Sequence, residues 1–563
     1  MKGRNEALSW AHYLSVVVIM AAVFALCMGV GPERAGSGEA NREKPAARPA
    51  AERETSAAVY LGDGASARAR AAAQWAAYAR VALEYAASPE ALPEGNPPGL
   101  ALVEPAAAAA YARTLQDWVE AGTDVICLGL PGADELARDE TLRALLGVRE
   151  IRAGRVPLKG IRVFPGFLLG GERLYEADGE ASGALPTDAP WFVVRENTTT
   201  YIRGLPEEDA RNEDLPALVW RCSRGRGALY AVFDGFADNP LTGMGMLAAI
   251  AAQRQSCALY PVVNARLLSL VHFPAATDGD DAAARRAYAA SPAALQRETI
   301  LPMCRAATER HGLRMTCFTA LFPGGGALPD GELTALRQEI DGMGGEVGLA
   351  WPGDAERLRP GALWLGDAAR PASWPEGVRT AVVSRDDGRP VVSRSDDDVT
   401  LQQAVHPAAT HAFSDDLELL GLETALGYAH AWLDMAPVLR PDSAADEWQN
   451  VSRAMFAGLA TAGAPFDAFD DVTASEADAR IRRFLALGWT YVRTGRHIAL
   501  DIDGFDTEAF FVLRTHGERV AAVSGGTGRQ IEEDAYLIRA MEPHVDIALY
   551  DALRARLGLE DEQ

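Results

Sequence analysis

The continuous apolar run Asp124–Leu130 restricts the fold of the first half of the chain more than any other feature. A strand that is apolar on both faces must be covered on both, which is typical of parallel sheets flanked by helices. Further strands are expected at 58–61, 101–103, 191–194, 217–220 and 228–233, with helical patterns at 111–120 and 244–253. This alternation predicts an α/β domain with a parallel sheet at residues 57–258.

That arrangement resembles, loosely, the flavodoxin-like sheet of class I glutamine-amidotransferase-like domains. Active members need a Gly-x-Cys-x-Gly elbow with a downstream His and Glu. Cys127 is followed by Gly129, but Val125 stands where the first glycine is needed, and no histidine lies between His12 and His272. A thiol without an activating base is inert. We therefore interpret Cys127 as a buried strand residue and the domain as non-catalytic.

The N-terminus contains an uncharged run, Tyr13–Val30, preceded by basic residues. At about 1.5 Å per residue the run reaches about 27 Å, just enough to cross a bilayer core. Residues 1–30 are thus predicted to be a signal anchor, a single-pass membrane helix that leaves the body on the extracytoplasmic side. A cleaved signal peptide and a lipidated Cys27 stay open as alternatives. The Pro-, Ala- and charge-rich residues 31–56 are expected to be a flexible tether.

The second half of the chain contains strands and helices in a characteristic order. A strand at 267–273 leads into Thr277-Asp-Gly-Asp-Asp281, and it is followed by a helix at 292–311, a strand at 314–321, a helix at 330–343 and a strand at 344–351. The segments His311-Gly-Leu313, Met315-Thr-Cys-Phe318 and Gly345-Glu-Val-Gly348 lie along this series. In order and spacing they resemble the motifs of the polysaccharide deacetylases, the NodB-type carbohydrate esterases.

The resemblance implies a distorted (β/α) deacetylase-like barrel at residues 259–497. Its Asp-Gly-Asp form resembles the deacetylase-like domain of proteins from Pel-type exopolysaccharide operons. The whole chain is also similar to a membrane-anchored domain-of-unknown-function family that accompanies such operons. Short branched or aromatic runs after the barrel predict a small antiparallel β-domain at residues 498–563.

The resemblance also implies roles for individual residues. In active members one Asp is the general base that activates water, and a second Asp with two histidines holds a divalent metal. Asp278 matches the base and Asp280 the metal ligand, but the two histidine positions are Leu349 and Gly353. Zinc usually takes three protein ligands. We therefore expect a barrel without cofactor that has lost the metal chemistry, with a divalent metal such as zinc only if it is active.

Some residues of this barrel are candidate contacts for a polysaccharide. His272 lies on the same strand as the Asp motif, and His430 lies where deacetylase-like relatives carry a late aromatic and histidine motif. An ordinary turn for the Asp cluster and hydrogen-bonded structural roles for the histidines stay open as alternatives. The candidates are His272, Asp278, Asp280, Asp281, Glu346, Trp351 and His430.

Three functions remain compatible with these features. The first is a membrane-anchored extracytoplasmic protein of exopolysaccharide biosynthesis or export, which binds polysaccharide through an inactive barrel and works with export or synthase membrane proteins. The second is an active metal-dependent deacetylase with rearranged ligands, and the third is a non-enzymatic scaffold for envelope assembly. The formal net charge of −24 disfavours nucleic acid and suits a cationic amino-sugar polymer.

Overall fold

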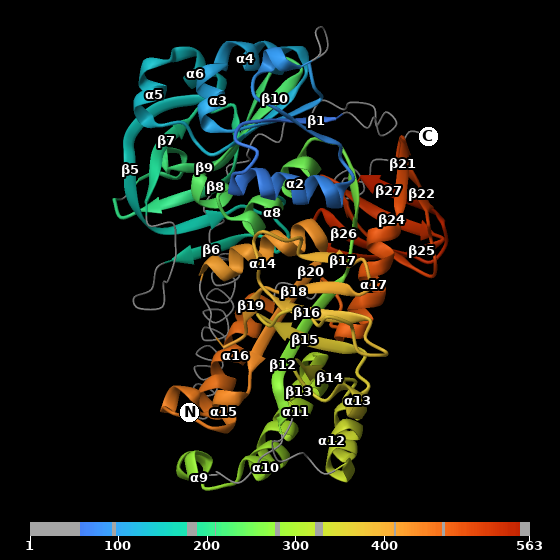
Figure 1. The fold of residues 1–563 in the computed structure, drawn as a ribbon. Coiled ribbons are helices and arrows are strands. Elements are labelled where there is room, and N and C mark those ends of the chain that lie inside the picture. The colour runs from blue at the N-terminus through green and yellow to red at the C-terminus, as the bar shows by residue number, and fades with distance from the viewer. Residues whose placement is uncertain are drawn as a thin grey trace, which may run out of the picture. The chain divides into compact units, whose positions relative to one another are not determined.

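The computed structural model describes residues 57–92, 97–176, 188–208, 210–275, 282–320, 330–409, 413–463 and 468–551. The predicted anchor and tether lie outside these residues. Within them, no helix combines the length and apolar composition that crossing a membrane requires. The described residues form helices and both parallel and antiparallel strands, so the α/β class expected from the sequence is confirmed (Figure 1).

The first sheet, blue to green in Figure 1, combines a parallel and an antiparallel part. The parallel part runs in the order β2 (Leu83–Ala86), β1 (Ala58–Leu61), β3 (Leu100–Val103), β4 (Asp124–Leu128) and β10 (Gly227–Val232). This is the 2-1-3-4-5 order of flavodoxin-like sheets. The sheet continues in antiparallel fashion through β9 (Ala217–Arg224), β8 (Thr198–Pro206), β5 (Val148–Val163) and β6 (Arg173–Glu176), and β7 (Asp188–Val194) pairs with β5. The parallel sheet expected from the sequence is therefore one part of this sheet, and its antiparallel part was not expected.

The second sheet curls until its two ends meet. The strands β12 (Ala265–Ala275), β13 (Met315–Ala320), β14 (Glu346–Ala350), β15 (Ala362–Gly366), β16 (Thr380–Ser384) and β18 (Thr400–Ala404) pair in parallel in chain order. On its other side β12 pairs with β20 (Tyr428–Asp434), and β20 pairs with β19 (His406–Pro407), which directly follows β18. The continuous segment from β18 to β19 therefore joins the two ends into a barrel.

The helices of this region cover the outer face of the barrel. The helices α11 (Leu301–His311) and α12 (Asp330–Gly342) contribute to one apolar layer with the outward residues of the strands. At the amino end of the barrel, α17 (Ala474–Ala486) begins against the strands, because the Ala474 amide donates to Thr316 Oγ1 at 2.9 Å and Gln402 Nε2 donates to the Ala474 carbonyl at 3.0 Å. α17 therefore covers the amino end of the barrel. A ligand site is expected at the opposite end, where the strands have their carboxyl ends.

Two four-stranded antiparallel sheets form the remaining unit, which is orange to red in Figure 1 except for β11, whose residue numbers fall in the green part of the colour bar. One contains β11 (Ala258–Val262), β23 (Ala509–Arg514), β26 (Ala535–Ala540) and β25 (Gly526–Glu532), and the other contains β21 (Gly488–Thr494), β22 (His497–Asp503), β27 (His544–Asp551) and β24 (Glu518–Ser524). Buried residues of both sheets share a core. These sheets also include β11 and β21, which lie outside the range 498–563 predicted for a small β-domain.

A pair of buried helices joins the first sheet to the barrel. Almost every residue of α8 (Pro240–Gln253) is buried, and α8 packs against α14 (Phe413–Leu426). A Cβ added to Gly245 would lie 2.1 Å from the Cα of Gly421. The helices thus approach to a distance that only glycine permits at this point. At the start of α8, Asn239 caps the helix and its side-chain amide donates to Glu418 of α14.

The helix contact yields a stability prediction. We expect Gly245→Ala to lower the free energy of unfolding by about 1–3 kcal/mol, because the new methyl group overlaps backbone that no rotamer change can move. Thermal and urea unfolding of the full chain measure the change. The control is Gly331→Ala in α12, where no described atom lies within 4 Å of the added Cβ. That variant should be neutral or up to about 1 kcal/mol more stable, and equal losses in both variants would contradict the prediction.

Candidate functional site

The carboxyl ends of two adjacent barrel strands bring a histidine and an aspartate together. Nδ1 of His272, near the end of β12, lies 2.8 Å from Oδ1 of Asp434, the last residue of β20. His272 adopts a left-handed backbone conformation (φ +57°), and the pairing of β12 with β13 shifts register beyond Val271. Both side chains stay partly exposed, at 31% and 39%. Ligand-binding groups gather at this end of such barrels.

The protonation of the pair follows from its hydrogen bonds. Burial alone would raise the pKa of Asp434, but hydrogen bonds from His272 and from the Ala436 amide lower the pKa of this carboxyl overall. Asp434 is therefore an ionised acceptor at neutral pH. Because the acceptor is an ionised carboxylate, Nδ1 of His272 carries the proton of this hydrogen bond. The pair thus offers a fixed carboxylate and an oriented imidazole.

Aromatic side chains line the inside of the barrel below this pair. Trp432 lies two residues before Asp434 and so on the same face of β20. Its ring centroid lies 5.4 Å from that of Trp364, which lies 5.8 Å from that of Phe318. Trp351 directly follows β14 and its amide donates to the Trp364 carbonyl at 2.8 Å, but its side chain packs against the apolar layer outside the strands. Aromatic surface with a few oriented polar groups is the usual composition of a small-ligand site.

The structure places two of the predicted contacts, His272 and Trp351, at this carboxyl end. Asp278, Asp280 and Asp281 lie outside the described residues. Asp434 was missed by the sequence analysis. No sequence motif marks it, because its proximity to His272 follows from the pairing of β20 with β12.

Glu346 lies at the opposite end of the barrel. It is the first residue of β14, and its carboxylate accepts from the amide and the hydroxyl of Ser475 in the first turn of α17. A carboxylate is stabilising at a helix N-terminus. Glu346 therefore holds α17 at the closed end of the barrel, away from His272 and Asp434, where it was predicted to contact polysaccharide.

His430 is fully buried in β20. The Tyr428 hydroxyl donates to the Gln403 carbonyl at 3.0 Å and lies 3.1 Å from His430 Nδ1, so Nδ1 carries the proton. Nε2 then accepts from the Ser269 hydroxyl at 2.7 Å. Burial lowers the pKa of His430 to about 3. The predicted contact with polysaccharide is wrong for His430, and the alternative of a hydrogen-bonded structural histidine is correct.

The positions matched to metal-binding histidines carry no donor. Leu349 is fully buried in the apolar layer outside the strands, and a Cβ on Gly353 would lie 2.8 Å from the Ala350 carbonyl. Among the described residues no three His, Cys, Asp or Glu side chains gather closely enough to hold a metal. The described residues therefore do not fit the metal site of active deacetylases, and we derive no step through a metal.

Cys127 in the first sheet is buried, as the sequence predicted. Its thiol donates to the Gly129 carbonyl at 3.0 Å, and burial raises its pKa to about 12. The thiolate needed by a nucleophile is therefore absent at neutral pH. Nearby, the carboxylate of Glu104 accepts from the hydroxyls of Tyr60 and Ser66, each at 2.6 Å. The protein's own side chains thus hydrogen-bond one another at the carboxyl ends of β1 and β3.

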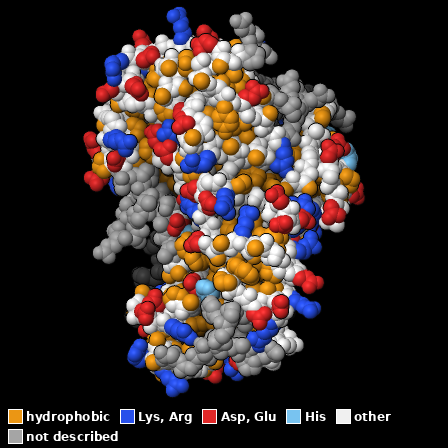
Figure 2. All heavy atoms as spheres, viewed as in Figure 1, with side chains coloured by type: hydrophobic (Ala, Val, Ile, Leu, Met, Phe, Trp, Pro, Cys, Tyr) orange, Lys and Arg blue, Asp and Glu red, His pale blue; other side chains and the backbone are white. Residues whose placement is uncertain are grey.

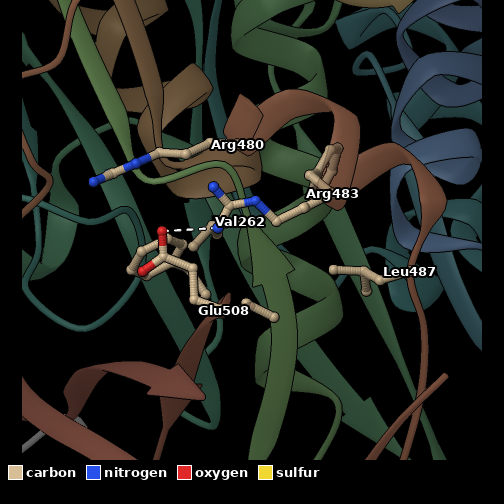
Figure 3. Close-up of a pocket in the computed structure, with 8 residues that line it drawn as sticks. Val262, Arg480, Arg483, Leu487 and Glu508 are labelled. Carbon is tan, nitrogen blue, oxygen red and sulfur yellow. Dashed lines mark hydrogen bonds and ion pairs between the residues drawn. The ribbon is translucent and has the colours of Figure 1, made fainter. Parts of the chain in front are cut away.

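A small cavity lies between α17 and β23, in a position that Figure 3 shows in close-up. Arg483 points toward Glu508 across it, with Nη1 2.8 Å from Oε1. Its volume of about 10 Å³ holds no more than a single water molecule. This cavity is therefore excluded as a sugar site.

Comparisons with known proteins add no family assignment. No protein-family model and no curated protein matches the chain. Among solved structures, the carbohydrate deacetylase Agd3 matches at 10% identity over 87% of this chain and 98% of that chain, with a TM-score of 0.43. The exo-β-1,4-mannosidase Op5Man5 from Opitutaceae bacterium strain TAV5 matches at 13% identity over 35% and 34%, with a TM-score of 0.22. Both TM-scores lie below 0.5, so neither structure indicates the fold or the function of this chain.

The buried histidine gives a prediction for acid stability. The folded-state pKa of His430, about 3, lies below the unfolded value of about 6.5. Between these values the unfolded chain binds a proton that the folded chain does not, so stability falls as pH falls through this window. From pH 6.5 to 4.5 the contribution of His430 to this loss is about 2–3 kcal/mol. Urea unfolding of the full chain at each pH measures the loss.

The variant His430→Gln should lower stability at pH 7 and flatten the pH dependence, because glutamine has no proton to gain. His497→Gln is the control, since His497 is exposed on β22. It should keep the dependence of the parent chain. An unchanged slope in His430→Gln would contradict the assignment of His430 as a neutral buried group.

Proposed function

We propose that this chain binds polysaccharide at the carboxyl end of its barrel. The single observation that carries the proposal is the partly exposed pair of His272 and Asp434, at the end where parallel barrels bind their ligands. The partly exposed Asp434 carboxylate supplies hydrogen-bond acceptors to sugar hydroxyl or amino groups. Trp432 supplies aromatic surface on the same face of β20 as Asp434.

The charge of the chain supports a cationic polymer. The sequence carries a formal net charge of −24, and Asp434 adds an ionised carboxylate within the site itself. A partly deacetylated hexosamine polymer carries ammonium groups, which an acidic surface concentrates by long-range attraction. The carboxylate can accept hydrogen bonds from such a group, and charge-assisted bonds are stronger than neutral ones. The proposal thus names a polymer of amino sugars.

The proposed setting is the extracytoplasmic side of the cell membrane. The uncharged run Tyr13–Val30 is long enough for a single-pass anchor, and the motifs between residues 267 and 351 resemble those of deacetylase-like proteins from exopolysaccharide operons. In this setting the chain would hold or guide the polymer during synthesis or export, beside synthase or export membrane proteins.

Affinity electrophoresis of the full chain through gels that contain chitosan tests the binding. We expect retardation in chitosan and none in neutral dextran. Asp434→Asn should weaken binding about tenfold or more, because losing a hydrogen bond to a charged group costs about 1.5–3 kcal/mol and each 1.4 kcal/mol is a factor of ten.

The control is Asp501→Asn, which alters a histidine–aspartate pair of the same spacing in the antiparallel unit. Nδ1 of His544 and Oδ1 of Asp501 also lie 2.8 Å apart, but on exposed strands of the antiparallel unit. Asp501→Asn should migrate like the parent chain. Equal weakening in both variants would show a general charge effect, and no retardation of the parent chain would contradict the proposal outright.

A deacetylase with rearranged ligands is the alternative, and the pair of His272 and Asp434 favours it over a simple scaffold. An imidazole oriented by a carboxylate is a common general acid or base. The test is acetate release from acetylated hexosamine oligomers, with elemental analysis of the same sample. If the alternative holds, acetate is released with stoichiometric metal, and His272→Gln lowers kcat by about 10²–10⁴-fold. Metal-free protein that releases no acetate after zinc is added would contradict it.

A further inference from the structure

A cavity of about 440 Å³ lies between α2 (Ala67–Ala79) and the segment 388–394, which includes β17 (Val392–Arg394). Leu485 of α17 forms part of its wall. The volume falls within the range of 300–1,000 Å³ that is usual for small-molecule sites. None of its lining residues belongs to the site at the carboxyl end of the barrel.

Hydrogen bonds between distant parts of the chain fix the walls of this cavity. The Tyr78 hydroxyl donates to the Val392 carbonyl at 3.0 Å and accepts from the Val392 amide at 3.1 Å. Gln74 Nε2 donates to the Arg389 carbonyl at 3.1 Å. Arg80 Nη2 donates to the Phe484 carbonyl at 2.9 Å. These hydrogen bonds connect the segments that form the walls, so the fold itself holds the cavity open.

The surface of the cavity is mostly apolar. Ala73 and Ala77 are exposed on the side of α2 that lines it, and their short side chains leave the space open. Pro390, Val392 and Leu485 form the facing surfaces. Walls of this kind favour a ligand with a flat or ring-shaped apolar face.

The charge of the lining is positive. Arg70, Arg80 and Arg394 line the cavity, and the described lining residues include no Asp or Glu. Arg394 pairs with Asp398, whereas Arg70 donates to the Ala65 carbonyl at 2.9 Å and has no ion-pair partner among the described residues. Figure 2 shows blue Lys and Arg side chains beside orange hydrophobic ones around α2 and β17. A cationic cavity stands out in a chain whose formal net charge is −24.

We propose that this cavity binds a small organic anion, in which a carboxylate or phosphate group is carried on a ring that has an apolar face. Guanidinium groups form paired hydrogen bonds with both kinds of anionic group. Arg70 approaches from α2, and the apolar walls accept the ring. Arg80, the residue after α2, donates to the Ala77, Phe484 and Leu485 carbonyls and contributes positive charge. The inference goes beyond the binding of polysaccharide, since it concerns a different ligand and a different part of the chain.

Calorimetric titration of the full chain with glucuronate, glucose 6-phosphate and neutral glucose tests the proposal. We expect at least one of the two anions to bind and glucose not to bind. Binding should also raise Tm, because a ligand that binds only the folded state stabilises it. Glucuronate alone identifies a carboxylate site, and glucose 6-phosphate alone identifies a phosphate site. The proposal is overturned if both anions fail to bind.

Two variants separate this cavity from general charge effects. Arg70→Gln removes a charge, and Ala77→Trp fills the space without changing charge. Each should weaken anion binding at least tenfold. Arg113→Gln is the control, because Arg113 is an exposed arginine on α4 (Ala112–Ala121). Binding that survives both cavity variants, or that falls equally in the control, overturns the proposal. Chitosan retardation should be unchanged in all three, so the two sites are tested independently.

Discussion

The close approach of α8 and α14 at Gly245 and Gly421 is the contact on which the rest of the structure depends. It is the point where the first sheet and the barrel share a buried helix pair. α8 also packs on α2, where a Cβ on Gly243 would lie 3.2 Å from the Cβ of Ala71. α2 in turn lines the cationic cavity. A change in the spacing of these helices would therefore alter the width of that cavity as well as the stability of the junction.

The sequence predicted those parts of the fold whose burial is uniform. The strands β4, β10 and β13 are buried along their whole length and β12 along most of it, because both of their faces are covered, and all four were expected. The strand β5 was missed, because its sequence contains arginine, glycine and proline and its burial changes along its length. It also pairs with three different strands. Such long-range pairing leaves no local periodicity for a sequence reading to detect.

The site was predicted less well than the fold, for a related reason. A motif identifies a position along a strand, but it does not say which end of the barrel that position occupies. Glu346 and His430 follow family motifs, yet Glu346 lies at the closed end of the barrel and His430 is fully buried. His272 was found because it lies near the carboxyl end of its strand. Asp434 became visible only when pairing placed β20 next to β12.

The pairing of β11 with β23 has a consequence for synthesis of the protein. Ala258 pairs with Arg514, so the partner of β11 emerges from the ribosome about 250 residues later. At roughly 5–20 residues per second this delay is on the order of tens of seconds. During that time the barrel strands can assemble, while β11 has no strand to pair with in the sheet. The antiparallel unit is therefore completed last. Its core then holds both β11, the strand before the first barrel strand, and β21, the strand that follows α17.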